Sequence, residues 1–277
     1  MKKIVLSSLL LATLAMAEEV TVAKDQVKLK ADIEAAKAAK KEAEGNIKAL
    51  EAQLPPNEQV MTIVRLGFIQ TTGNSETETF SVYANAKKAW DKHNVSLEFD
   101  GQYGKADDVE NVKKVFLEGN YGYSFLETLS ATGVAGYKKD AFSSYSHQSY
   151  IGPGLKWLTY KSTKQELSLE GSILYAKDDA RDVNAGLQGE YGAYRAKLLY
   201  ALNLLDNLKF EQEASYKGSF DESDNYFVVS RSALSSKISD IFSAGISYKV
   251  DYTNKVDVAA NIKQQDNTLE AFLSVDY

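Results

Sequence analysis

The chain has 277 residues with two histidines and no cysteine, which excludes disulfides and thiolate metal sites and argues against a histidine-built metal centre. Its net charge of −6 comes without a basic stripe, so a nucleic-acid partner is not expected. Seventeen tyrosines against three prolines favour strands that lie near a boundary between polar and apolar surroundings.

The first residues have the pattern of a secretory signal peptide. Lys2 and Lys3 give a positive start, an apolar run follows over 4–16, and residues 15–17 form an Ala-Met-Ala cleavage site. The run is shorter than the roughly 20 residues that a membrane-spanning helix needs. We therefore expect residues 1–17 to be removed on export into the periplasm of a Gram-negative envelope, an uncleaved anchor being the alternative.

Residues 18–54 are rich in Ala, Lys and Glu and predict a periplasmic helix. Positions spaced alternately by four and three residues from Val22 to Leu54 follow the heptad pattern of a coiled coil, although Ala, Lys and Gln interrupt the apolar seam. The pattern is compatible with a homo-oligomer formed through residues 20–54, with a helix folded onto its own protein, and with a helix that reaches toward peptidoglycan. Pro55-Pro56 ends the helix, and residues 55–59 are expected to be a linker.

From residue 60 onward the sequence alternates with a period of two, which is the pattern of β-strands with two different faces. In one segment Phe242, Ala244 and Ile246 share one face, while Ser243 and Lys249 share the other. Twelve such segments occupy residues 60–277. They are expected to begin near residues 60, 77, 93, 112, 128, 146, 165, 184, 208, 224, 241 and 265.

The connections between these segments alternate in length. After a short first hairpin at 71–76, longer polar connections are expected at 104–112, 138–147, 177–186, 219–225 and 254–267. Tight turns are expected at 91–94, 125–128, 161–164, 205–207 and 239–240. Outer-membrane barrels place long loops outside and short turns in the periplasm, and an even strand number returns both ends to the periplasm.

The sequence therefore predicts an all-β fold. This is a twelve-stranded antiparallel transmembrane β-barrel over 60–277, preceded by the short helical segment. Its expected location is the bacterial outer membrane, among outer-membrane lipids, with the N-terminal segment in the periplasm. A soluble β-sandwich is the alternative.

The last ten residues, TLEAFLSVDY, resemble the C-terminal strand by which outer-membrane barrels are presented to the barrel-assembly machinery. Every second residue back from the end is apolar, and the terminal aromatic residue is expected at the periplasmic aromatic girdle. The expected assembly signal is Leu269, Ala271, Leu273, Val275 and Tyr277.

The more apolar face of each strand is assigned to lipid, which places Val95, Leu97 and Phe99 outside. Strands eight and ten have the least determined register, since Ser230 and Ser232 fall on an otherwise apolar face. The opposite face carries charges of both signs, and twelve strands enclose a lumen between a filled and an open one. Interlocking ion pairs are therefore expected in a small or closed pore. The predicted lumen charges are Glu98, Asp100, Glu170, Lys209, Glu211, Glu213, Lys249 and Asp251.

No catalytic, cofactor-binding or metal-binding residues are predicted. His147 lies among serines and near Asp140, which are residue types of a serine hydrolase, but a polar outer loop accounts for this composition better. The acidic stretches at 107–110 and 221–224 lack the spacing of a dedicated calcium site.

The turn Thr71-Thr72-Gly73-Asn74-Ser75 and the strand after it resemble the start of the domain of unknown function 481 family, described as salt-induced outer-membrane proteins. The segments DNLKFEQEASYKGSFDESDNY (206–226) and SAGISYKVDY (243–252) resemble its later strands. The resemblance covers about 60–277 and implies an outer-membrane barrel tied to a salt or osmotic response. It supplies no catalytic or ligand residues and does not extend to the helical segment.

Residues and resemblance together predict a non-enzymatic outer-membrane β-barrel that is structural or a narrow pore. A porin-like diffusion channel for small solutes and a barrel enzyme acting on lipids are the alternatives. The first would show as conductance, and the second as an activity lost in His147→Ala.

Overall fold

The computed structural model describes residues 34, 37, 60–71 and 77–276. The expected signal peptide (1–17) and linker (55–59) lie outside the described residues. So does the expected helix (18–54), except Glu34 and Lys37, which are helical and form an exposed ion pair at 3.2 Å. Among the residues described, no helix is long and apolar enough to cross a membrane.

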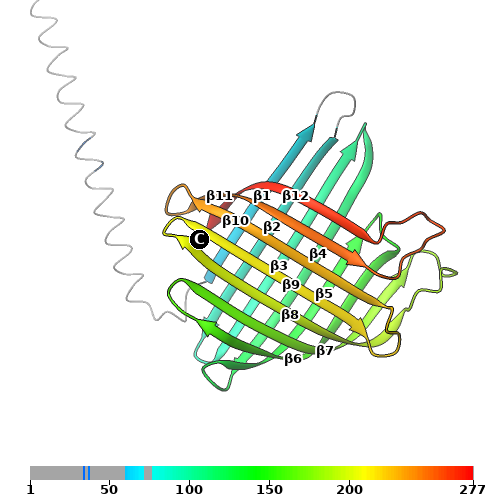
Figure 1. The fold of residues 1–277 in the computed structure, drawn as a ribbon, viewed down its shortest axis with the longest axis horizontal. Coiled ribbons are helices and arrows are strands. Elements are labelled where there is room, and N and C mark those ends of the chain that lie inside the picture. The colour runs from blue at the N-terminus through cyan, green and yellow to red at the C-terminus, as the bar shows by residue number, and fades with distance from the viewer. Residues whose placement is uncertain (1–33, 35–36, 38–59, 72–76, 277) are drawn as a thin grey trace, which may run out of the picture. The chain divides into compact units, whose positions relative to one another are not determined.

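Twelve antiparallel strands form a closed barrel in which each strand pairs with its sequence neighbours and β1 pairs with β12 (Figure 1). This confirms the predicted fold class. The strands are β1 (Val60–Thr71), β2 (Thr77–Trp90), β3 (His93–Ala106), β4 (Val109–Ser124), β5 (Leu129–Asp140), β6 (Tyr145–Lys161), β7 (Gln165–Ala180), β8 (Glu190–Leu205), β9 (Leu208–Ser219), β10 (Tyr226–Lys237), β11 (Phe242–Thr253) and β12 (Gln265–Asp276).

The two ends of the barrel differ in their connections. One end, called here the turn end, holds the connections at 91–92, 125–128, 162–164, 206–207 and 238–241, together with the start of β1 and the end of β12. The opposite, loop end holds the connections at 72–76, 107–108, 141–144, 181–189, 220–225 and 254–264. Only the last three of these are much longer than the turns, so the alternation of lengths is weaker than predicted.

Three expected connections are corrected by the structure. The predicted long connection at 138–147 is only residues 141–144, because β5 runs to Asp140 and β6 begins at Tyr145. The predicted long connection at 104–112 is a two-residue turn, because Asp107 and Asp108 both take left-handed backbone angles, with φ of 48° and 62°, and the flanking strands continue up to them. Strand β8 begins at Glu190 rather than 184, since β7 extends to Ala180 and the connection is correspondingly shifted.

The alternation of side chains determines what faces the lumen. On β3, Glu98, Asp100 and Gln102 are buried inside, whereas Val95 and Leu97 are exposed outside. The same pattern buries Leu174 and Ala176 of β7 in an apolar cluster inside the barrel. The packed core of this protein is therefore its lumen, and the exposed apolar residues form the outer surface.

Strand β10 places its serines on the outer face, which answers the register question. Phe227, Val229 and Arg231 line the interior cavity described below, so Ser230 and Ser232 point outward. There the amide of Gln212 on β9 donates to Ser230 at 3.1 Å and accepts a hydrogen bond from Ser232. The outward hydroxyls are thus satisfied by a neighbouring amide rather than left bare.

The outer surface carries aromatic residues toward both ends. Tyr121, Tyr123 and Trp157 are exposed toward the turn end. Toward the loop end, four tyrosines from β8 to β11 stack in a row, with centroid separations of 5.9, 5.5 and 5.9 Å. These are Tyr194, Tyr216, Tyr226 and Tyr252. Aliphatic residues such as Leu97 and Ile173 lie exposed between the two bands.

Candidate functional site: the ion-paired lumen

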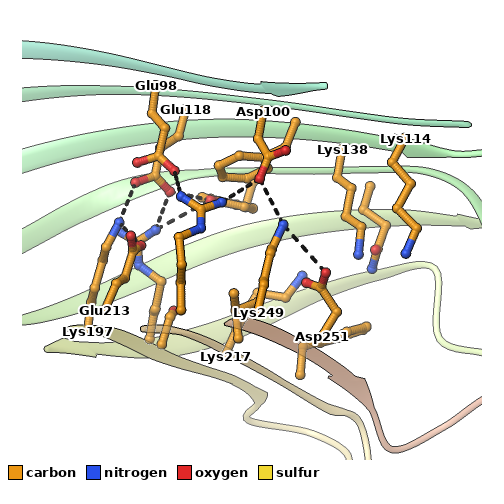
Figure 2. A pocket seen from close by; sticks show the side chains of 18 of the residues that line it. Glu98, Asp100, Lys114, Glu118, Lys138, Lys197, Glu213, Lys217, Lys249 and Asp251 are labelled. Carbon is orange, nitrogen blue, oxygen red and sulfur yellow. Dashed lines mark hydrogen bonds and ion pairs between the residues drawn. The ribbon is translucent and has the colours of Figure 1, made fainter. Parts of the chain in front are cut away.

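A fork-shaped contact joins opposite walls of the barrel. The guanidinium of Arg231 on β10 donates to Asp100 on β3 and, at 3.4 Å, to Glu98 on the same strand. Around the ring, β3 and β10 are separated by β1, β2, β11 and β12 on the shorter side, so these bonds cross the lumen. Lys249 of β11 adds bonds to Asp100 at 2.9 Å and to Asp251 at 3.5 Å (Figure 2).

A second set of ion pairs lies beside the first. Arg195 of β8 binds Glu118 of β4 at 2.5 Å and Glu170 of β7 at 2.7 Å. Lys197 lies between Glu118 at 3.4 Å and Glu213 at 2.7 Å. The side chains of Arg195 and Glu118 are only 4% and 2% exposed, so this contact is shielded from solvent. Charges buried this deeply need such partners, because an isolated buried charge is very costly.

A third set involves β1. Arg65 binds Glu211 of β9 at 2.5 Å, and Lys209 binds the same carboxylate at 2.8 Å. The Arg65 guanidinium also lies 4.9 Å from the ring centroid of Phe272 and 5.2 Å from that of Tyr83, which are cation–π distances. These three sets together are called here the ion-pair partition.

All eight lumen charges expected from the sequence lie in the ion pairs just described. The structure also shows charged residues inside the barrel that the sequence analysis did not predict. Lys114 pairs with Asp266 at 2.6 Å and with Asp140 at 3.6 Å, and the fully buried Asp178 pairs with Lys217 at 3.6 Å. Asp178 falls within the connection predicted at 177–186, but β7 continues past it with the same inward alternation as the other lumen charges.

The space left inside the barrel is small. The larger cavity has a volume of about 130 Å³, and a second of about 20 Å³ lies beside it against Arg65, Ser81 and Glu270. A water molecule occupies roughly 30 Å³ in the liquid, so the larger cavity accommodates a few waters or one small solute. The ion-pair partition thus fills a lumen that twelve bare strands would leave wider.

The connection between β11 and β12 crosses the loop end. The main-chain N–H of Asp257 donates to the hydroxyl of Ser144 at 2.8 Å, although the β11–β12 and β5–β6 connections lie on opposite sides of the ring. Lys255 binds Glu222 at 2.5 Å, and this hydrogen bond raises the pKa of Lys255 above its usual range. Residues 254–264 therefore form a strap over the mouth, held by two other connections.

The expected assembly signal lies on the outer face of β12. Leu269, Ala271, Leu273 and Val275 are exposed there, and Tyr277 lies outside the described residues. The ladder that closes the barrel pairs Ile63 through Gly67 of β1 with residues 276 through 272 of β12.

The serine- and histidine-containing segment forms a contact at the loop end. His147 pairs with the carboxylate of Asp179, and the Ser146 hydroxyl lies 3.3 Å from the other ring nitrogen. The same hydroxyl lies 3.1 Å from the main-chain oxygen of Asp179, to which it also donates. These contacts join the start of β6 to the end of β7. Within the described part of the chain, no group of three or more His, Asp or Glu residues is placed to hold a metal ion.

Comparisons with solved structures find two porins and an outer membrane channel at low identity. The NanC porin is 11% identical with a TM-score of 0.44, covering 78% of this chain and 97% of its own. The KdgM porin, in a complex with disordered oligogalacturonate, is 10% identical with a TM-score of 0.42 over 78% and 99% of the two chains. The COG4313 outer membrane channel from Pseudomonas putida F1 is 9% identical with a TM-score of 0.46 over 80% and 97%.

No curated protein matches the chain. A family model described as "Protein of unknown function, DUF481" matches residues 64–277, which is most of the sequence and nearly the whole barrel. The resemblance seen in the first hairpin and the later strands is thereby confirmed, and the chain belongs to the DUF481 family.

Proposed function

We propose that this protein is a non-enzymatic outer-membrane β-barrel whose lumen is a narrow pore, constricted at mid-depth by the ion-pair partition. The observation that carries the proposal is the contact of Arg231 with Glu98 and Asp100, which ties β10 to β3 across the lumen. The exposed aliphatic surface between two aromatic bands supports membrane insertion, because outer-membrane barrels display this arrangement to lipid.

Planar-bilayer recording tests the pore. The wild type is expected to conduct weakly, since the free volume along the lumen is small. Removing the bridge in Arg231→Ser, and in Arg231→Ser combined with Glu98→Ser, is expected to raise single-channel conductance in two steps. Lys237→Ser removes an exposed cation from the turn end of the same strand and is the matched control. Equal conductance in all four proteins would contradict a partition that limits flow.

A diffusion channel for small solutes is the second candidate. The cavity of about 130 Å³ beside the partition favours it, because one small solute fits there without breaking the bridges. Uptake of a small solute into vesicles by the wild type, at a rate that Arg231→Ser does not increase, would favour this candidate over the constricted pore.

The remaining expectations belong to the same proposal. A link to salt response, implied by the family resemblance, predicts a growth defect of a deletion strain at high salt. Recognition of the last strand by the barrel-assembly machinery predicts less heat-modifiable, folded barrel in cells when Tyr277 is deleted. Self-association through residues 20–54 or proximity to peptidoglycan predicts crosslinks that disappear when 18–54 is removed.

A further inference from the structure

One end of the larger cavity is lined by lysines from four strands. Lys114 of β4, Lys138 of β5, Lys217 of β9 and Lys249 of β11 all border it, and this group is called here the lysine vestibule (Figure 2). The cavity is also bordered by carboxylates: Glu98, Glu118 and Glu213 of the partition, and Asp100 and Asp251 beside Lys249.

The four lysines are unequally compensated. Lys249 has Asp100 and Asp251, and Lys114 has carboxylates at 2.6 and 3.6 Å. Lys138 has no carboxylate within ion-pair distance among the described residues, although it projects into the cavity beside Lys114 in Figure 2. Among the four lysines, Lys138 is therefore the one without a carboxylate at ion-pair distance among the described residues.

Lys217 lies across the vestibule and is weakly paired for its burial. It is 9% exposed, and its one carboxylate contact is Asp178 at 3.6 Å. Its ammonium lies 4.3 Å from the ring centroid of Phe227 and 5.6 Å from those of Tyr150 and Tyr191. Aromatic faces attract a cation but accept no conventional hydrogen bond from it, so donor capacity remains.

Gln148 completes the donor set. It is the cross-strand partner of Lys138 in the β5–β6 ladder, is 8% exposed, and borders the same cavity. Two ammonium groups and an amide thus border the same cavity. These donors suit the acceptor oxygens of an oxyanion, because hydrogen bonds to a charged group are roughly twice as strong as neutral ones. The apolar walls at Phe227 and Val229 limit water and strengthen such contacts.

We propose that the lysine vestibule binds a small oxyanion, a carboxylate or phosphate group, between Lys138, Lys217 and Gln148. The proposal names small oxyanions as the solute class of the narrow pore, and its physiological meaning rests on the proposed function. The binding itself requires only the folded barrel, so it is measured independently of conduction.

Calorimetric titration of the full-length protein in non-ionic detergent, with inorganic phosphate and with acetate at constant ionic strength, tests the site. Lys138→Gln is expected to weaken binding of the anion at least about tenfold, as for the loss of one hydrogen bond to a charged group. Lys138→Arg should restore it. Lys139→Gln removes the neighbouring, outward-facing cation and should bind as the wild type does. Heat-modifiability on a gel verifies that each variant is folded. Gln148→Leu is a second substitution in the site and is also expected to weaken binding of the anion.

The outcomes separate the two proposals. Anion binding that depends on Lys138, in a protein that shows no conductance, supports the vestibule and overturns the pore. Conductance without binding of phosphate or acetate, or with equal binding to Lys138→Gln and the wild type, overturns the vestibule and leaves the pore standing. Binding of acetate alone or phosphate alone identifies which oxyanion the site takes.

Discussion

Replacing Arg231 with glutamine tests how strongly the partition holds the barrel walls together. The substitution removes the charge and one arm of the fork and leaves Glu98 and Asp100 facing the lumen with side chains only 11% and 8% exposed. Breaking a buried ion pair by removing one partner costs about 3–5 kcal/mol. Because Lys249 still binds Asp100 at 2.9 Å, the lower end, about 3 kcal/mol, is expected.

Two further variants refine the magnitude. Arg231→Lys keeps the charge, but a compact ammonium does not bridge two carboxylates as a guanidinium fork does, so roughly half of the loss is expected. Arg231→Gln combined with Glu98→Gln removes the charge on both sides of the longer bond. The double variant is expected to recover on the order of 1 kcal/mol relative to the sum of the single ones, as contacting residues usually do.

The assay is urea unfolding of the barrel in lipid vesicles, followed by tryptophan fluorescence. The chain has two tryptophans, and Trp157 is 50% exposed on the outer surface, so its emission reports departure from lipid. Lys237→Gln, at the exposed end of the same strand, is the control and is expected to unfold with the wild type. A free energy of unfolding for Arg231→Gln within about 0.5 kcal/mol of the wild type, the range of ordinary surface changes, would refute the reasoning.

Other substitutions probe the wall, the membrane face and the strap. Gly152→Ala places a methyl group 2.0 Å from a main-chain oxygen of β7, so the free energy of urea unfolding is expected to fall by about 3 kcal/mol. Gly119→Ala has open space around the added methyl group and is the control, with little change expected in the free energy of unfolding. Leu97→Arg, on the exposed aliphatic face, is expected to lose about 2–4 kcal/mol of stability in vesicles, and a loss below 1 kcal/mol would place this face outside the bilayer. Lys255→Gln should speed protease cleavage of the strap at neutral pH, because it removes the contact with Glu222. In the wild type this contact is present below the ordinary lysine pKa and is lost as the pH rises through the raised pKa of Lys255. Cleavage of the wild type that stays slow above that pH would contradict the ion pair.

The strand positions and the direction in which each side chain points, into the lumen or outward, were largely predictable, because the alternation of polar and apolar residues is a local property of the sequence. Glu98 and Asp100 could be assigned to the interior, and Leu97 to the exterior, from their spacing alone. The errors lie where local pattern and turn chemistry compete. Around 107–108, a polar stretch that reads as a loop is folded into a tight turn by left-handed aspartates, and the strands on both sides run on to meet it.

The partners of the lumen charges could not be predicted from the sequence. Alternation places Glu98 and Asp100 inside, but which residues meet them across the lumen depends on how the sheet closes. Glu213 is the ladder partner of Arg231 on the neighbouring strand, yet Arg231 binds Glu98 and Asp100 on the far wall, and Glu213 binds Lys197. Closure is a global property, so distant pairs of this kind lie beyond reasoning from one strand at a time.

The narrowness of this lumen is a consequence of side-chain length more than of strand number. Twelve strands fall between barrels that side chains fill and barrels that enclose an aqueous channel. Here long arginine and lysine stems extend from β8, β10 and β11, and carboxylates from β3 and β4 meet them partway across. Shortening one stem removes a bridge without moving the wall that carries it. The free width of this lumen therefore depends on individual side chains, and shortening Arg231, which contacts both Glu98 and Asp100 on the opposite wall, is expected to widen it.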